Sequence, residues 1–201
     1  MKKSIFKIIE RIEKQEIEIA HYLENPDLKP SIPRVKFWNV PKNTARLLNF
    51  FVLSTNAKII LELGCSVGYS ALWMSMAAEY TGGHIYTTEK YDPKIKLAKE
   101  NIKDAGVESI ITLIEGDIHD TLKNWNKGQI DMVFLDADKK SYLDYYESVI
   151  PFMKTNGILI ADNVSNMADT MIPFLERTKT DNRVVNQILD IDNGLSIIYK
   201  K

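Results

Sequence analysis

Oxygen-bearing side chains follow two apolar segments in the second half of the chain. Asp136 follows the run Ile130–Leu135, and Asp162 and Asn163 follow the run Gly157–Ala161. Ligands of open α/β sheets bind beyond the carboxyl ends of the strands, so these side chains converge if the two runs are neighbouring strands. Oxygen donors without His or Cys favour a hard cation such as Mg²⁺. The alternative is that all three residues only cap the helices that follow.

A glycine-containing turn follows an earlier apolar run. Gly64 and Gly68 let the backbone turn tightly and approach a ligand closely, just before a helix. A dinucleotide fingerprint requires glycine at the position of Ser66, so a smaller cofactor is favoured over NAD. An ordinary strand-to-helix turn is the alternative, and Cys65 within it is expected to pack rather than react.

Two acidic residues follow the next two apolar runs. Glu89 ends the run after the glycine turn, where a carboxylate is suited to accept hydrogen bonds from ribose hydroxyls. A solvated charge at the end of a strand is the alternative. Asp117 is placed to cap the next helix.

Alternating elements position these residues. Strands are expected over 58–63, 84–89, 110–115, 130–135 and 157–161, and helices over 70–80, 93–105, 118–125, 142–153 and about 170–178. Two further runs, 184–191 and 195–199, flank Asn193-Gly194 and predict an antiparallel hairpin. Repeated strand–helix units predict a doubly wound α/β domain with a mostly parallel sheet and an antiparallel C-terminal edge.

The N-terminal segment has a different pattern. Pro41 and three earlier prolines predict an extended chain until a second helix near Thr44. Those earlier prolines are Pro26, Pro30 and Pro33. Before them, apolar residues at helical spacing predict an amphipathic helix that packs on its own domain, with a dimer contact or a membrane-surface role as the other uses. A two-fold homodimer is expected, because the rest of the domain need not cover this stripe fully. The stripe consists of Ile5, Ile8, Ile9, Ile12, Ile19, Ala20 and Leu23.

Composition limits the class of protein. The chain has 201 residues, of which 45% are apolar and 26% charged, a composition that excludes collagen and disorder. Its net charge of −1 gives no general attraction to nucleic acid. A single cysteine excludes an internal disulfide. With neither an uninterrupted apolar leader nor a membrane-length apolar run, a single cytoplasmic domain is expected.

Four motifs together resemble the cation-dependent S-adenosylmethionine O-methyltransferases, which include catechol and caffeoyl-CoA enzymes and small bacterial relatives. They are ILELGCSVGYSALWMS, TTEKYDP, DMVFLDADKKSYLDYYE and GILIADNV, and the resemblance covers about residues 36–200. It implies a Rossmann-like core over 44–201, with residues 1–43 as a helical extension and cofactor-covering segment. It also implies S-adenosylmethionine and Mg²⁺, or another hard cation such as Mn²⁺ or Ca²⁺.

The resemblance implies roles for matching residues. The implied cofactor contacts are Val40, Glu62, Gly64, Cys65, Gly68, Ser70, Glu89, Asp117, Ile118 and Asp136. Asp136, Asp162 and Asn163 match the metal ligands, and Lys139 matches the general base. Gln187 stands about where catechol enzymes place a Glu that faces the second substrate hydroxyl, which puts catechol itself in doubt.

The expected reaction is methyl transfer to a metal-chelated hydroxyl of a small catechol-like or phenolic substrate. The resemblance also implies a main alternative acceptor, hydroxyuridine in tRNA, because some small bacterial relatives modify that base. The net charge of −1 argues mildly against tRNA, whereas Lys139, Lys140 and the basic N-terminus leave room for local phosphate contact. A non-catalytic binding protein on the same scaffold and an NAD-dependent oxidoreductase are the other readings.

Overall fold

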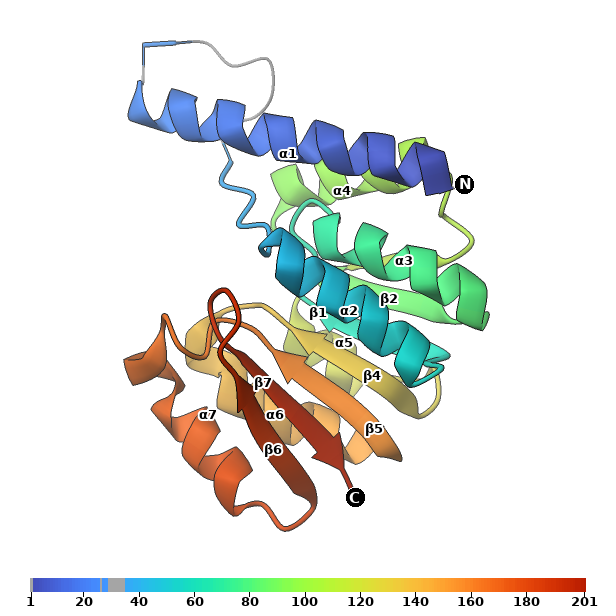
Figure 1. The fold of residues 1–201 in the computed structure, drawn as a ribbon, viewed down its shortest axis with the longest axis vertical. Coiled ribbons are helices and arrows are strands. Elements are labelled where there is room, and N and C mark those ends of the chain that lie inside the picture. Colours follow the sequence, from blue (N-terminus) through green and yellow to red (C-terminus); the bar gives the residue numbers. More distant parts are fainter. Residues whose placement is uncertain (1, 26, 29–34) are drawn as a thin grey trace.

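The computed structural model describes residues 2–25, 27–28 and 35–201. One sheet of seven strands, in the order β3-β2-β1-β4-β5-β7-β6, forms its centre (Figure 1). The strands are β1 Ile59–Leu63, β2 His84–Glu89, β3 Ile111–Glu115, β4 Ile130–Leu135, β5 Met153–Ala161, β6 Val184–Leu189 and β7 Leu195–Lys200. The helices are α1 Lys2–Glu24, α2 Lys42–Ser54, α3 Tyr69–Thr81, α4 Asp92–Ala105, α5 Ile118–Lys123, α6 Tyr142–Val149 and α7 Ala168–Thr180, with short 3₁₀ helices at Lys139–Ser141 and Ile150–Phe152.

The strand directions confirm the doubly wound α/β prediction. Strands β1 to β5 pair in parallel, whereas β7 pairs antiparallel with both β5 and β6. Leu63 lies opposite Leu135, and Leu135 lies opposite Ala161. Strands β1, β4 and β5 therefore end at the same level, and the residues that follow them share one edge of the sheet.

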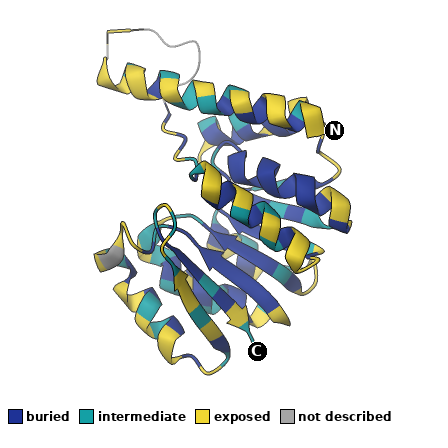
Figure 2. Ribbon diagram, viewed as in Figure 1, coloured by how far each residue is buried: buried dark blue, intermediate teal, exposed yellow. Residues whose placement is uncertain are grey.

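Helices cover both faces of the sheet (Figure 1). Helices α1 to α4 contribute to one hydrophobic cluster and α5 to α7 to the other. Ile60 and Phe134 belong to the first cluster, and Leu61 and Val133 to the second. The central strands are buried on both faces, as Figure 2 shows, which explains their continuous apolar sequences.

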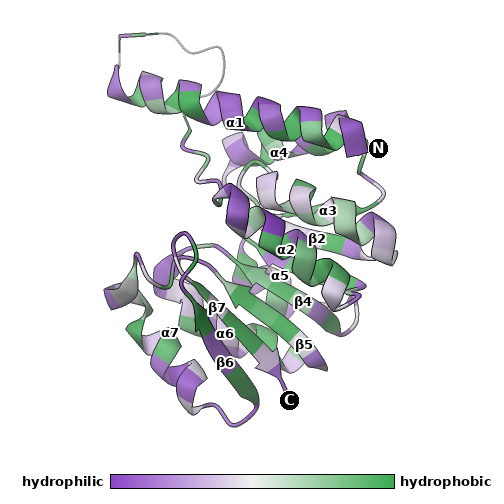
Figure 3. Cartoon of the chain, viewed as in Figure 1, coloured by the Kyte–Doolittle hydropathy of each residue, from purple (hydrophilic) through white to green (hydrophobic). Residues whose placement is uncertain are grey.

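The N-terminal helix packs on its own domain, as predicted. Five of its six isoleucines, at positions 5, 8, 9, 12 and 19, are buried in the cluster with α3 and α4, and its other face is mostly hydrophilic, with Ile17 exposed (Figure 3). Arg11 also forms an ion pair of 2.7 Å with Asp104 of α4. Ala20 and Leu23, expected in the stripe, are exposed instead. The homodimer stays a prediction. The isoleucine stripe gives it no support, because the stripe is buried within the domain.

Two differences from the sequence-based boundaries occur where the predicted helix 142–153 meets β5. The helix predicted over 142–153 ends at Val149, because Pro151 has no N–H to continue the hydrogen-bond ladder. Met153 instead begins β5 and pairs with Ile130. Pro41 precedes α2 in an extended conformation, whereas Pro26, Pro30 and Pro33 lie outside the described residues.

Membrane insertion by a helix has no support in the described part of the chain. None of its helices combines the length and the apolar character that a membrane span requires.

Candidate functional site

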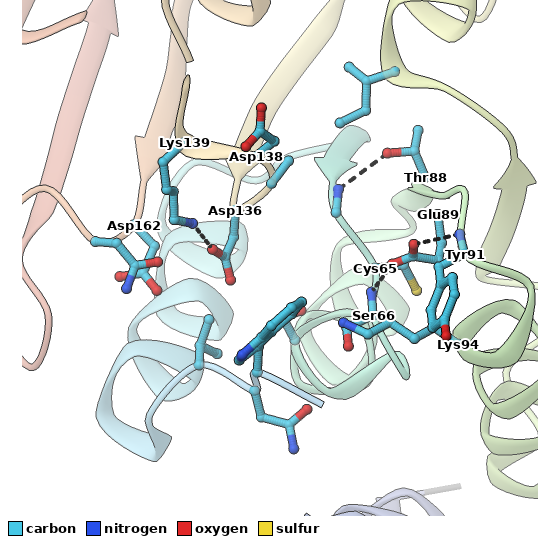
Figure 4. A pocket seen from close by; sticks show the side chains of 18 of the residues that line it. Cys65, Ser66, Thr88, Glu89, Tyr91, Lys94, Asp136, Asp138, Lys139 and Asp162 are labelled. Atoms are coloured by element: carbon cyan, nitrogen blue, oxygen red, sulfur yellow. Dashed lines mark hydrogen bonds and ion pairs between the residues drawn. The ribbon is translucent and has the colours of Figure 1, made fainter. Parts of the chain in front are cut away.

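A cavity of about 1010 Å³ opens at the carboxyl ends of the parallel strands. Figure 4 shows side chains from both halves of the sheet pointing into it. It brings together most of the residues singled out from the sequence: Val40, Gly64, Cys65, Ser70, Glu89, Asp117, Ile118, Asp136, Lys139, Asp162 and Asn163. Glu62 and Gly68 are not among its lining residues.

The glycine turn forms the floor of this cavity. Gly64 has a φ of +107°, and a Cβ placed on it would lie 2.1 Å from the backbone oxygen of Asp136. Only glycine therefore fits between β1 and the end of β4. Gly68, with a φ of +90°, ends the turn as the residue before α3.

Cys65 lies within the turn rather than at the start of a helix, because α3 begins only at Tyr69. The thiol is buried, and burial raises its pKa well above the usual value. This environment suits a packed cysteine rather than a thiolate.

Glu62 is a buried carboxyl that acts behind the cavity wall. It accepts hydrogen bonds from the hydroxyls of Ser70 and Thr87, each at 2.5 Å. Burial raises the pKa of Glu62 to about 7. Any influence of Glu62 on a ligand is therefore indirect, through the position of Ser70 at the wall.

Glu89 is fixed by the main chain around it. Its carboxylate accepts hydrogen bonds of 2.9 Å from the backbone N–H groups of Ser66, Lys90 and Tyr91 (Figure 4). Three such bonds hold the carboxylate at the cavity wall without a neutralising cation. A hydrogen-bond donor on a ligand can therefore meet a preorganised acceptor here.

Asp117 has the capping role expected from the sequence. It accepts a 2.9 Å hydrogen bond from the backbone N–H of His119 at the start of α5. That hydrogen bond, together with the nearby Lys90 ammonium at 3.3 Å, lowers the pKa of Asp117. Asp117 and Ile118 form the wall on the β3 side.

The segment before α2 covers the glycine turn. Ser66 donates a hydrogen bond from its hydroxyl to the backbone oxygen of Phe37, and Asn39 donates twice to Glu16 of α1. Val40 and Trp38 of this segment line the cavity. Helix α1 therefore helps to hold the segment around Asn39 in place through Glu16. The resemblance implies that residues 1–43, which include this segment, cover a cofactor.

Asp136 and Asp162 end the neighbouring strands β4 and β5. Their backbone N–H groups continue the sheet ladder, to Leu63 at 3.0 Å and to Leu135 at 3.1 Å. Asp162 is only 1% exposed, and its Oδ1 is buried without a hydrogen-bond partner. Burial, and then the charge of Asp136, raises the pKa of Asp162 to about 7.

The donor set at these strand ends fits a hard divalent cation. An orphaned buried carboxylate oxygen is costly unless something compensates it, and a cation would do so at Asp162. Mg²⁺ is commonly held by one or two carboxylates together with waters or substrate oxygens. The described residues form no group of three or more His, Cys, Asp or Glu side chains suited to a metal, so a cation beside Asp136 and Asp162 would need further ligands such as the Asn163 amide, water or substrate oxygens.

Lys139 follows Asp136 by one turn and points back to it. Its ammonium donates to Oδ1 of Asp136 at 2.5 Å and to the hydroxyl of Tyr142 at 2.8 Å. Tyr142 in turn donates to the backbone oxygen of Leu135 at 3.0 Å. This chain of contacts fixes the lysine between β4 and α6 at the rim of the cavity.

The β6–β7 turn supplies a wall that the sequence did not reveal. Asn193 lines the cavity, and its backbone oxygen accepts from Ser165 at 3.1 Å. Asp192 accepts from the backbone and hydroxyl of Thr44 at 2.9 and 2.8 Å, which ties the turn to α2. Gln187, expected near the substrate, is instead exposed on the edge strand β6 and does not line the cavity.

The fold is that of Rossmann-like methyltransferases. A methyltransferase of Podospora anserina solved in its SAH-bound form has a TM-score of 0.76 and 26% identity, with 81% of this chain and 80% of that chain covered. Residues 21–201 match the O-methyltransferase family, and the chain belongs to that family.

Individual relatives agree with this assignment. The chain is 36% identical over 130 residues to a catechol O-methyltransferase of Niastella koreensis, which covers 63% of this chain and 58% of the relative. It is 30% identical over 170 residues to a caffeoyl-CoA O-methyltransferase of Populus kitakamiensis, covering 79% and 72%. The match thus spans less than two thirds of the Niastella protein.

Proposed function

We propose that the protein is an S-adenosylmethionine-dependent O-methyltransferase that requires a divalent cation and methylates a small aromatic substrate with neighbouring hydroxyls. The observation that carries this proposal is the unpaired buried Oδ1 of Asp162, beside Asp136, in the cavity that also contains the glycine turn and Glu89. Family membership and the SAH-bound Podospora relative support the cofactor.

The β1–β2 side of the cavity suits the cofactor. Glu89 would accept hydrogen bonds from the ribose, and Ser70 and Val40 would face the methionine end. Asp117 and Ile118 would border the adenine. S-adenosylmethionine supplies an electrophilic methyl group, and the cavity would orient it toward the β4–β5 side.

Asp136, Asp162 and Asn163 would hold the cation. A divalent cation acts there as a Lewis acid and a template that lowers the pKa of a bound hydroxyl. These three residues end two paired strands, so they would keep a fixed spacing during the reaction. Good orientation alone can supply about 7–11 kcal/mol in favourable cases.

Lys139 would remove the hydroxyl proton. Its Nζ lies 2.5 Å from Oδ1 of Asp136, next to the carboxylate that would help to hold the cation and the substrate hydroxyl. Tyr142, 2.8 Å from the same nitrogen, keeps the side chain at the rim of the cavity.

The acceptor end of the cavity favours a compact aromatic molecule. Trp38, Met167 and Asn193 line it together with the strand-end carboxylates, which mixes apolar surface with a few polar groups. The catechol and caffeoyl-CoA names of the relatives agree with an acceptor that has two adjacent oxygens.

Calorimetry followed by an acceptor panel tests the proposed function. S-adenosylmethionine and SAH (its demethylated product) should bind, and NAD should not. With Mg²⁺, methyl transfer should occur to catechols or phenolic thioesters and not to total tRNA. Binding of NAD alone, or methylation of tRNA alone, would contradict the proposal.

A further inference from the structure

Lys94 is a largely buried lysine whose side chain lines the cavity. It lies in the first turn of α4, is only 6% exposed and lines the cavity wall. Figure 4 shows its side chain extending past Tyr91 toward Ser66. A lysine this deeply buried normally has an anionic partner.

No such partner is present among the residues that the structure describes. The one direct contact of the Lys94 ammonium is the ring of Trp38, with Nζ 4.3 Å from the ring centroid. A cation over a tryptophan face is held by a weak attraction that does not satisfy its N–H donors. Burial lowers the pKa of Lys94, and the negative charges of Glu89 and Asp136 oppose this shift.

Trp38 is itself held in place by its two chain neighbours. Phe37 accepts a hydrogen bond from Ser66, and Asn39 is bound to Glu16. Lys94 and Glu89 both line the cavity, and no ion pair joins these two residues.

The hydrogen-bond capacity of Glu89 explains why a second residue is needed. A carboxylate offers about four lone-pair sites, and backbone N–H groups already occupy three of those on Glu89. A ribose presents two adjacent hydroxyls, each of which donates and accepts. The one lone-pair site left on Glu89 can accept from one ribose hydroxyl. The hydroxyl oxygens can also accept hydrogen bonds, and a donor to them has to come from another residue of the wall.

We propose that Lys94 and Glu89 hold the ribose of the cofactor between them, with a hydroxyl donating to Glu89 and a ribose hydroxyl oxygen accepting from the Lys94 ammonium. Lys94 is then a cofactor-binding residue and Trp38 its positioning residue. This inference rests on the proposed function, since it takes the cofactor to be S-adenosylmethionine.

The test is a calorimetric comparison that needs neither acceptor nor metal. Wild type, Lys94→Met and Lys96→Met are titrated with SAH and with its 2′-deoxy and 3′-deoxy analogues. Lys96 is an exposed lysine on the same helix, so its variant controls for the charge change. Lys94→Met should weaken SAH binding about 10- to 100-fold, as expected for one hydrogen bond to a charged group, and Lys96→Met should leave it unchanged.

The analogues identify the group that Lys94 contacts. In the wild type, removal of the contacted hydroxyl should weaken binding, but in Lys94→Met the same removal should have little further effect. If Lys94→Met weakens the binding of SAH and of both deoxy analogues by the same factor, the assignment is contradicted. So would a Lys94→Met effect that vanishes with 5′-methylthioadenosine, which keeps the ribose and lacks the methionine carboxylate.

Two controls separate the possible failures. Thermal unfolding of each variant is measured first, and Lys94→Leu replaces Lys94→Met if the latter does not fold. Wild type that does not bind SAH at all would contradict the proposed function. Wild type that binds SAH while Lys94→Met binds it equally well would overturn only the role of Lys94.

Discussion

Glu16 of α1 accepts two hydrogen bonds from Asn39, one from its backbone N–H at 3.1 Å and one from Nδ2 at 2.9 Å. Asn39 lines the cavity, whereas Glu16 precedes residue 21, where the match to the family begins. The N-terminal helix therefore helps to hold a segment of the cavity wall, which is the proposed cofactor cover, although the helix lies largely outside the family match.

Glu16→Ala should weaken SAH binding by roughly fivefold to tenfold, about 1 kcal/mol, because the cover must then be ordered by the ligand. Calorimetry measures the effect, and Glu10→Ala on an exposed part of the same helix is the control. An unchanged dissociation constant for Glu16→Ala would show that the cover does not depend on α1.

Gly64→Ala should destabilise the protein by more than about 3 kcal/mol and abolish methyl transfer. The new Cβ would meet the backbone oxygen of Asp136 at 2.1 Å, in a conformation with positive φ. Gly106→Ala is a matched control, since its φ is +71° but nothing lies within 4 Å. That control should lose only about 1 kcal/mol in urea unfolding; equal losses for the two variants would contradict the close approach.

The sequence predicted the positions that obey local rules. Asp136, Asp162 and Asn163 could be placed together because parallel strands end at a common edge, and the register of β4 with β5 agrees. Asn193-Gly194 likewise predicted the C-terminal hairpin, which the structure confirms.

Contacts between distant segments could not be predicted in this way. Lys94 reads as one of several lysines on α4, and only the folded chain puts it over Trp38. An approximate alignment puts Gln187 near the substrate, but it is exposed on the outermost strand β6 and does not line the cavity. The resemblance implies that Glu62 contacts the cofactor, but Glu62 is buried behind the cavity wall and accepts a hydrogen bond from Ser70.

Glu62 should give the stability of the protein a pH dependence. Burial raises its pKa from 4.5 to about 7, so between these values the native state retains a proton that the unfolded chain loses. The free energy of unfolding therefore falls as pH rises through this window. Gln at position 62 does not titrate. The free energy of unfolding of Glu62→Gln, relative to that of wild type, should therefore rise by about 3 kcal/mol from pH 4.5 to pH 8.

Urea unfolding at pH 4.5 and pH 8 measures this change for Glu62→Gln. Glu108→Gln, at an exposed site, should show no such trend. A stability difference between Glu62→Gln and wild type that is the same at both pH values would mean that Glu62 ionises normally.

Asp162→Asn should lower methyl transfer at least 100-fold while changing the affinity for SAH less than about threefold. The reason is that Asp162 belongs to the β4–β5 end of the cavity, whereas Glu89 and the glycine turn form the cofactor end. Initial rates over a series of Mg²⁺ concentrations measure the first effect and calorimetry the second. The exposed Asp138→Asn, with the same change in charge, should retain activity.

The most direct test of the account is methyl transfer from S-adenosylmethionine to a catechol acceptor by wild-type protein, before and after treatment with EDTA. We predict that EDTA abolishes transfer, that added Mg²⁺ restores it in wild type, and that Mg²⁺ fails to restore it in Asp162→Asn. Transfer at the full rate in EDTA would contradict the account, because Asp136, Asp162 and Asn163 would then have no role as ligands of a cation.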